Sequence, residues 1–343
     1  MIVNKVTLNN LPINRFSNFQ ENYSSSKNNY YYDTKQKTDN NVYPISKAAN
    51  SALRSLAFAG INFLEKDRTN ITPQLQEKID YNKKVLNTMF KYDRQSQYPM
   101  VKSVKEGFVD KLAKRMALYP NKPLMVAITG ESASGKTTLT DLFMSYADRK
   151  NVKISLLKTD NYFKDLTHLL KKHGSYSGII NSGYEIDSPN NFYLDDLKQD
   201  ITDLANGKNI KGREYYMDGT CKSVANCLPV QSNKIVFVEG TAAMLDDISD
   251  LFDVKIYVET DDYTRKDRML KRAPNRGHSP SVALQQWEMV KAAGEKYVKP
   301  FKEKCDIVLE GGHNMKNTST QVNNTLYDLY MGFGEPKNKN KIA

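Results

Sequence analysis

The chain has 343 residues, of which 39% are hydrophobic and 26% charged, and its formal net charge at pH 7 is +11. This length can bury a large core, and no apolar run approaches the roughly 18 residues that span a bilayer, so the sequence predicts a cytoplasmic protein of one or two domains without a membrane partner. The positive charge is compatible with a nucleic acid or a polyphosphate ligand, but lysines are interleaved with acidic residues and neither an RNA-binding aromatic motif nor a zinc-finger spacing is present in the sequence. We therefore expect one anion site and no nucleic acid partner.

The N-terminal third of the chain falls into two parts of different composition. Residues 1–45 are rich in Asn, Ser, Tyr and Lys and show no apolar periodicity, which predicts a disordered arm. Residues 46–120 carry apolar side chains at steps of three and four, which predicts a helical extension that ends at Pro120.

Residues 121–332 are predicted to form the main domain, followed by a polar tail at 333–343. Short apolar runs recur in this domain and are separated by amphipathic helical stretches; the runs are LMVAIT, VKISLLKTD, KIVFVEG, DVKIYVET and CDIVLEG. Strands that alternate with helices predict an α/β fold, in which a parallel sheet carries helices on both faces.

The first of these strands leads into the sequence GESASGKTT at residues 130–138. Gly130, four further residues, and then Gly135, Lys136 and Thr137 match the phosphate-binding loop (Walker A motif) of a P-loop NTPase fold, and the motif requires the strand before it and the helix after it. Glycines let backbone amides approach an anion, and the helix N-terminus adds positive potential. We predict that Lys136 contacts the terminal phosphates of a nucleotide and that Thr137 binds Mg²⁺. The predicted nucleotide-binding residues are Gly130, Ser132, Ser134, Gly135, Lys136, Thr137 and Thr138.

Acidic residues end two other predicted strands, and the carboxyl ends of parallel strands meet at one edge of a sheet. Asp160 follows the second strand, where a carboxylate can accept the proton of an attacking hydroxyl in phosphoryl transfer. It can also cap the segment that follows. Glu239 ends the strand KIVFVEG, where it can hold Mg²⁺ directly or through water, or pair with a lysine.

A run of arginines follows the strand DVKIYVET at helical steps of three and four. Arginines on one helical face, next to a turn that contains Pro and Gly, predict a lid that closes on the transferred phosphoryl group. A solvated helix face is the alternative. Within the run of Arg265, Arg268, Arg272 and Arg276, we favour Arg268 and Arg272 as the residues that reach the phosphates.

Together these segments resemble the uridine kinase and phosphoribulokinase family. Residues 123–312 contain, in the order of that family, GESASGKTT, TDNYFKD, YEIDSPNNFYLDDLKQDI, IVFVEGTAAM, DLFDVKIYVETDDYTRKDRMLKR, RGHS and KPFKEKCDIVLEGG, and the uridine (uridine/cytidine) kinase branch is the most similar. The resemblance implies phosphorylation of a sugar hydroxyl with ATP or GTP, which is the ribose 5′-hydroxyl of a nucleoside in this branch. Family members often form tetramers, so a homo-oligomer is one expectation.

The resemblance also implies roles for single residues. Asp160 would be the catalytic base, Thr137 and Glu239 would be the Mg²⁺ partners, and Asp187 would hold the ribose of the acceptor. The other implied contacts are Tyr162, Tyr215 and Gln286 to the acceptor and Lys136, Arg268 and Arg272 to the phosphates.

The chain departs from the uridine kinase pattern in its acceptor segments. That branch usually has Asp-His-Pro where this chain has Asp187, Ser188 and Pro189, and R-G-R where it has residues 276–278 with the sequence RGH. Thr220 and Lys222 stand where the branch has a histidine that contacts the pyrimidine and an arginine. Two alternatives to a nucleoside kinase therefore stay open. One is a kinase of another small hydroxyl metabolite, similar to phosphoribulokinase, pantothenate kinase or glycerate kinase, and the other is a non-catalytic nucleotide-binding protein.

Overall fold

The computed structural model describes residues 71–95, 99–149, 152–217, 219–274 and 279–312. The predicted arm at 1–45, the start of the helical extension at 46–70, the end of the main domain at 313–332 and the tail at 333–343 lie outside these ranges, as does Arg276 of the predicted lid. The described residues belong to one compact unit.

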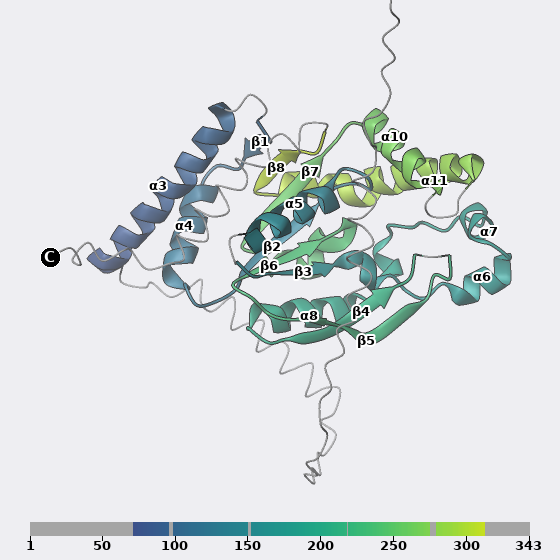
Figure 1. Cartoon of the computed structure of the whole chain (residues 1–343), viewed down its shortest axis with the longest axis horizontal. Coiled ribbons are helices and arrows are strands. Elements are labelled where there is room, and N and C mark those ends of the chain that lie inside the picture. Colours follow the sequence, from purple (N-terminus) through teal and green to yellow (C-terminus); the bar gives the residue numbers. More distant parts are fainter. Residues whose placement is uncertain (1–70, 96–98, 150–151, 218, 275–278, 313–343) are drawn as a thin grey trace, which may run out of the picture. The chain divides into compact units, whose positions relative to one another are not determined.

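A six-stranded sheet with the order β1-β8-β7-β2-β6-β3 forms the centre of this unit (Figure 1). Its parallel strands are β2 (Leu124–Thr129), β3 (Ile154–Lys158), β6 (Ile235–Glu239), β7 (Val254–Glu259) and β8 (Ile307–Glu310). Each lies within one of the apolar runs of the sequence, which confirms the predicted parallel sheet. In the register of the sheet, Glu239 lies opposite Ile128 on one side and Lys158 on the other, so β2, β3 and β6 end at the same level.

Alternate side chains of the strands pack against helices on the two faces of the sheet. Val126, Phe237 and Ile256 point to the face covered by α3 (Pro73–Gln95), α4 (Phe108–Leu118) and α5 (Lys136–Arg149). Ala127 and Val238 point to the other face, where the core is completed by α8 (Leu194–Ala205), η3 (Thr241–Met244), α9 (Asp246–Ser249) and η6 (Lys299–Lys304). Burial on both faces explains why the strands read as continuous apolar runs.

The described part of the N-terminal extension shares the core of the sheet. Leu86 and Phe90 of α3 and Leu112 of α4 belong to the same buried cluster as the β2 side chains. Arg115 ties α4 to the amino end of β7 through a bidentate ion pair with Asp253, at 2.8 and 2.9 Å. The sequence does not predict β1 (Val101–Val104), which lies between these helices and pairs antiparallel with β8.

Further elements lie beyond the carboxyl ends of the strands and surround the site. A 3₁₀ turn, η1 (Thr159–Tyr162), follows β3 and leads to α6 (Thr167–His173), α7 (Tyr176–Asn181) and η2 (Pro189–Asn191). Strands β4 (Ile210–Tyr215) and β5 (Ser223–Val230) form an antiparallel hairpin, which the sequence does not predict. No helix in the part of the chain that the structure describes is long and apolar enough to cross a membrane.

The segment after β7 forms two helices with clear capping signals. In α10 (Asp262–Arg272), the side chain of Asp261 accepts a hydrogen bond from the amide of Thr264 at 2.8 Å. In α11 (Pro280–Ala293), Ser279 caps the first turn and proline occupies the first helical position, which needs no amide donor. A π-helical turn, η5 (Gly294–Val298), continues α11.

Candidate active site

The phosphate loop lies between β2 and α5, and its backbone takes conformations that favour glycine at several positions. Gly130 and Gly135 have φ values of 145° and 105°. A Cβ atom on Gly130 would lie 2.3 Å from the carbonyl oxygen of Val258, so no larger residue fits there. Ala133 adopts a left-handed φ of 66°, at a cost of about 1 kcal/mol. Such alternation of backbone conformation creates a concave row of amides that suits an anion.

The side chains of Arg268 and Lys136 hold carbonyl groups of the loop. Arg268 of α10 donates to the carbonyls of Ala133 and Ser134 at 3.1 and 3.2 Å, and its other nitrogen reaches Gly311 and Gly312 after β8. Arg268 therefore braces the loop against the end of the sheet. The ammonium of Lys136 donates to the carbonyls of Gly130 and Glu131 at 2.9 and 3.0 Å.

Three carboxylates meet near Lys136 at the carboxyl edge of the sheet. Asp160 comes from η1, Glu239 from the end of β6, and Asp187 from the loop before η2. Burial raises the pKa of Glu239, the charge of Lys136 opposes this shift, and the nearby Asp160 adds to it. Burial lowers the pKa of Lys136, while all three carboxylates oppose this shift. The three acids therefore act electrostatically on one ammonium group.

Thr137 and Glu239 supply oxygen atoms that fit Mg²⁺. The hydroxyl of Thr137 lies 3.2 Å from the Oε1 atom of Glu239. Magnesium at phosphoryl-transfer sites is bound by one or two protein oxygens together with substrate phosphates and waters, and these two side chains offer a hydroxyl and a carboxylate beside the loop.

Asp187 is buried and incompletely hydrogen-bonded. Its Oδ1 atom accepts from the hydroxyl of Thr241 at 3.1 Å, whereas its buried Oδ2 atom has no partner among the described residues. Burial and then the charge of Asp160 raise the pKa of Asp187 to about 6. Because buried polar atoms are nearly always hydrogen-bonded, the Oδ2 atom is suited to a donor from a ligand.

A cavity of about 500 Å³ connects these groups. Most of the predicted site residues line it, namely Ser132, Gly135, Lys136, Thr137, Thr138, Asp160, Asp187, Tyr215, Glu239, Arg268, Arg272 and Gln286. Gly130 and Ser134 belong to the loop but not to the cavity wall. Residues far apart in the sequence therefore share one space.

Tyr162 does not line the cavity. Its side chain is fully buried, and its hydroxyl donates to Asp200 of α8 at 2.5 Å. The next residue, Phe163, lines the cavity instead and stacks on Phe192, with ring centroids 4.3 Å apart. Both rings belong to the buried cluster that contains the α8 side chains, but only the ring of Phe163 also borders the cavity.

Sequence reasoning missed several residues of the cavity wall. They are mainly apolar or aromatic and come from the segments around α7 and the β-hairpin, namely Phe163, Leu166, Tyr176, Tyr184, Ile186, Met217 and Cys221. The high tyrosine content of these segments was the available signal. The hairpin itself was not predicted, so the position of Cys221 beside Tyr215 was not predicted either.

The fold and the site define a P-loop kinase: a parallel sheet ends in a phosphate loop, and an acidic residue that can serve as a base lies in the same cavity. Residues 125–318 match the sequence model of the Phosphoribulokinase / Uridine kinase family, and the chain belongs to this family. It is accordingly an ATP-dependent phosphotransferase with an alcohol group as acceptor.

Known proteins of similar sequence carry the name uridine kinase. The chain is 32% identical over 198 residues to the uridine kinase of Clostridium novyi (strain NT), which covers 56% of this chain and 90% of that protein. It is also 32% identical over 198 residues to a uridine kinase of Staphylococcus epidermidis, covering 57% and 91%.

Solved structures of similar fold share less sequence. A putative fructose transport system kinase from Silicibacter sp. TM1040 has a TM-score of 0.43 at 16% identity, covering 55% of this chain and 90% of that one. Phosphoribulokinase from Rhodobacter spheroides has a TM-score of 0.41 at 15% identity, covering 55% and 70%.

Proposed function

We propose that this protein is a uridine/cytidine kinase that transfers the γ-phosphate of ATP to the ribose 5′-hydroxyl of a pyrimidine nucleoside, with Mg²⁺ as cofactor, in the cytoplasm. The observation that carries the proposal is that Asp160 and Asp187 line the same cavity as Lys136 of the phosphate loop. The names of the relatives of similar sequence support the same assignment.

The proposed reaction divides the work among groups that lie in this cavity. The loop amides and the ammonium of Lys136 bind the terminal phosphates and orient them. Asp160 accepts the proton of the acceptor hydroxyl, and the oxygen of this hydroxyl attacks the γ-phosphorus while the bond from the γ-phosphorus to the β,γ-bridging oxygen breaks and ADP leaves. Asp187 accepts a hydrogen bond from the ribose. Thr137 and Glu239 would hold Mg²⁺, which neutralises phosphate charge when bound.

The charge of the cavity wall favours an uncharged acceptor. Among the described residues, the cations that line the cavity are Lys136 and the α10 side chains of Arg268, Lys271 and Arg272. The described residues of 163–187 and 215–221 that line the cavity have aromatic, apolar, thiol and hydroxyl side chains, and Asp187 is the one charged residue among them. A phosphorylated or carboxylated acceptor would gain from a cation there, so the described part of this wall favours an uncharged acceptor.

A second candidate is a kinase of another uncharged hydroxyl metabolite. Cys221 lines the acceptor end of the cavity, and its sequence neighbours Thr220 and Lys222 differ from the uridine kinase pattern. This difference affects recognition of the acceptor and leaves the phosphate loop unchanged.

The decisive experiment incubates the purified full chain with labelled ATP and Mg²⁺ and a panel of acceptors. The panel contains uridine, cytidine, adenosine, ribose, ribulose 5-phosphate, pantothenate and glycerate. We expect phosphorylation of uridine or cytidine in preference to the others. Transfer to a different uncharged acceptor alone would favour the second candidate. Nucleotide binding without transfer to any acceptor would favour a non-catalytic protein.

A further inference from the structure

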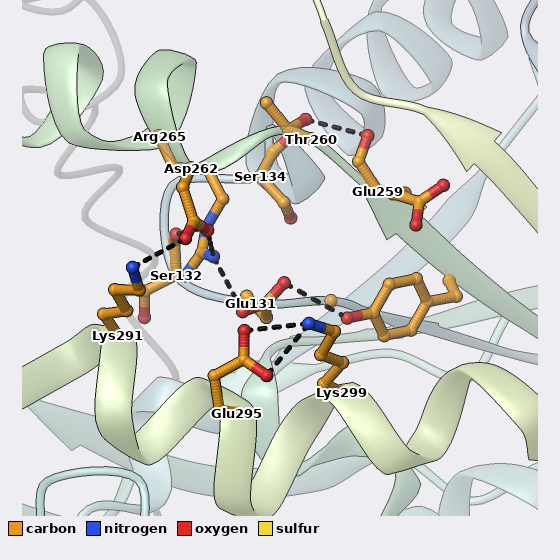
Figure 2. A network of polar contacts seen from close by, with 12 residues as sticks. Glu131, Ser132, Ser134, Glu259, Thr260, Asp262, Arg265, Lys291, Glu295 and Lys299 are labelled. Atoms are coloured by element: carbon orange, nitrogen blue, oxygen red, sulfur yellow. Dashed lines mark hydrogen bonds and ion pairs between the residues drawn. The ribbon is translucent and has the colours of Figure 1, made fainter.

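A buried ion pair joins the phosphate loop to helix α10 (Figure 2). The Nη1 atom of Arg265 lies 2.7 Å from the Oε1 atom of Glu131, and the two side chains are 0% and 10% exposed. Glu131 follows Gly130 directly, so a carboxylate belongs to the very loop that is proposed to bind a polyphosphate. A negative charge at this position opposes the binding of an anion unless a cation cancels it.

Arg265 holds the backbone of the loop as well as its carboxylate. Its Nε atom donates to the carbonyl of Ser132 at 3.0 Å, and its Nη1 atom also reaches Asp262 at 2.9 Å. The ring of Trp287 from α11 lies against the guanidinium, with its centroid 5.4 Å from the central carbon. A fully buried guanidinium with these contacts has little freedom to move, so it fixes the position of residues 131 and 132.

The other charged groups around Glu131 are largely engaged with each other (Figure 2). Lys291 of α11 pairs with Asp262 at 3.0 Å, and Lys299 pairs with Glu295 at 2.8 Å. The hydroxyl of Tyr257 on β7 lies 3.5 Å from the Oε2 atom of Glu131. Burial raises the pKa of Glu131, and the charge of Arg265 opposes this shift; Glu295 and Asp262 raise it and Lys299 lowers it. Arg265 is therefore the main cation that balances Glu131.

Stability alone does not explain such a pair. The cost of desolvating two charges commonly equals or exceeds their attraction, so a buried ion pair is weak evidence for a stabilising role. Because Glu131 belongs to the phosphate loop, the ion pair can instead affect how well the loop binds an anionic ligand.

We propose that Arg265 is a positioning residue for the nucleotide: it cancels the charge of Glu131 inside the phosphate loop and fixes the loop backbone at Ser132, so that the loop accepts a polyphosphate. The proposal rests on the nucleotide-binding function proposed for this loop. It predicts that the two members of one ion pair have opposite effects on nucleotide affinity.

The test compares Arg265→Met with Glu131→Gln in the full chain, and measures the Kd for MgATP by calorimetric titration. Arg265→Met leaves an unbalanced buried carboxylate on a residue of the phosphate loop, and we expect it to raise Kd roughly tenfold or more at about pH 8. Glu131→Gln keeps an acceptor for Arg265 but removes the negative charge, and we expect an unchanged or lower Kd. If the ion pair had only a structural role, both single variants would raise the Kd for MgATP.

The pH dependence provides a second readout that a structural role would not produce. Burial raises the pKa of Glu131, and without Arg265 the carboxyl group loses the main interaction that opposes this shift, so it takes up a proton more readily as the pH is lowered from about 8. The rise in the Kd for MgATP caused by Arg265→Met should therefore become smaller as the pH falls. The double variant of Glu131→Gln and Arg265→Met should bind more tightly than Arg265→Met at about pH 8 and show no such pH dependence.

The matched control is Arg115→Met, which removes an arginine from the ion pair with Asp253 at the opposite edge of the sheet. It should lower the melting temperature without changing the Kd for MgATP. A wild-type Kd in Arg265→Met, or an equal rise of Kd in both single variants, would overturn the proposal. If Arg265→Met does not fold, a raised Kd in Glu131→Gln overturns it by itself. A wild-type chain that does not bind MgATP would instead reject the proposed function.

Discussion

The hydroxyl of Thr137 and the carboxylate of Glu239 lie 3.2 Å apart, although 102 positions separate the two residues in the chain. Thr137 stands in the first turn of α5, directly after the phosphate loop, and Glu239 is the last residue of β6. Because β2 and β6 are parallel neighbours, with Ile128 opposite Glu239, the loop and the carboxylate reach the same edge of the sheet. This register places two oxygen ligands beside the proposed phosphate site.

Replacing Glu239 with Gln tests its proposed role toward Mg²⁺. The amide keeps the shape of the side chain but removes its charge, so we expect the Mg²⁺ concentration for half-maximal activity to rise roughly tenfold or more. Kinase assays over a Mg²⁺ titration measure this change. The matched control is Glu259→Gln, since Glu259 also ends a strand of the sheet but pairs with Lys102 and Lys302. Equal Mg²⁺ requirements in the two variants would argue against the assignment.

Asp160→Asn should separate catalysis from nucleotide binding. Asparagine cannot accept the proton of the acceptor hydroxyl, so we expect kcat to fall by roughly 10²–10⁴-fold. The Kd for MgATP should change little, because Lys136 and the loop backbone are intact. Single-turnover assays and calorimetric titration measure the two quantities, and an unchanged kcat would remove Asp160 from the mechanism.

Asp187→Asn should stabilise the protein at neutral pH while weakening acceptor binding. The pKa of Asp187 is raised from 3.8 to about 6, so between these pH values the folded chain binds more protons than the unfolded chain, and this group makes stability fall as pH rises. Asparagine carries no charge and avoids this loss of stability, so we expect the free energy of unfolding to rise by about 3 kcal/mol at about pH 8, a gain that is lost below about pH 4. Denaturant unfolding at the two pH values measures it.

The functional half of this prediction is a higher KM for the acceptor in Asp187→Asn, because the ribose loses its charged hydrogen-bond acceptor. The KM for ATP should stay close to that of the wild type. A variant that is less stable than the wild type at about pH 8 would show that the charge of Asp187 is compensated in the folded protein.

Gly240→Ala should disturb the position of Asp160. A Cβ atom on Gly240 would lie 1.9 Å from the hydroxyl oxygen of Thr159 and 3.3 Å from the Oδ1 atom of Asp160, and its φ of 145° disfavours any side chain. We expect η1 to shift, and kcat to fall roughly 10²-fold from misplacement of the base alone. A crystal structure of the variant and its kcat test this; full activity would show that η1 tolerates the added methyl group.

Leu86→Ala tests whether α3 belongs to the core of the kinase domain. Leu86 is 1% exposed in the cluster that also contains side chains of β2 and β7, and such truncations cost about 2–5 kcal/mol in the free energy of unfolding. Tyr81→Ala is the control on the same helix, since Tyr81 is 51% exposed and its loss should cost little. Equal and small effects would mean that α3 contributes no core contacts.

The arrangement of the sheet and the phosphate loop could be predicted because both depend on local patterns. Strands buried on two faces must be apolar along their whole length, and the run from Leu124 to Thr129 shows this directly. The phosphate loop needs glycines at defined spacing for its backbone conformation, so Gly130 and Gly135 identify it without knowledge of the fold.

Strand β1 could not be predicted, because its four residues are formed into a strand by pairing with β8, roughly two hundred residues later in the chain, and not by their own pattern. The same holds for Tyr162 and Phe163: both are aromatic and adjacent in the sequence, and only the folded chain shows that Tyr162 bonds to Asp200 of α8 while Phe163 lines the cavity.

The sequence by itself determined the parallel strands, the phosphate loop and the acids that follow the strands, since hydrophobic periodicity and backbone conformation act over a few neighbouring residues. Only the tertiary structure decided that Arg265 is a buried partner of Glu131, while Arg268 braces the loop from the same helix face. In the sequence, both residues are arginines of the same run, in which the arginines follow each other at helical steps of three and four. What distinguishes them is which groups the folded chain brings within hydrogen-bond distance, and that depends on the packing of α10 and α11 against the loop.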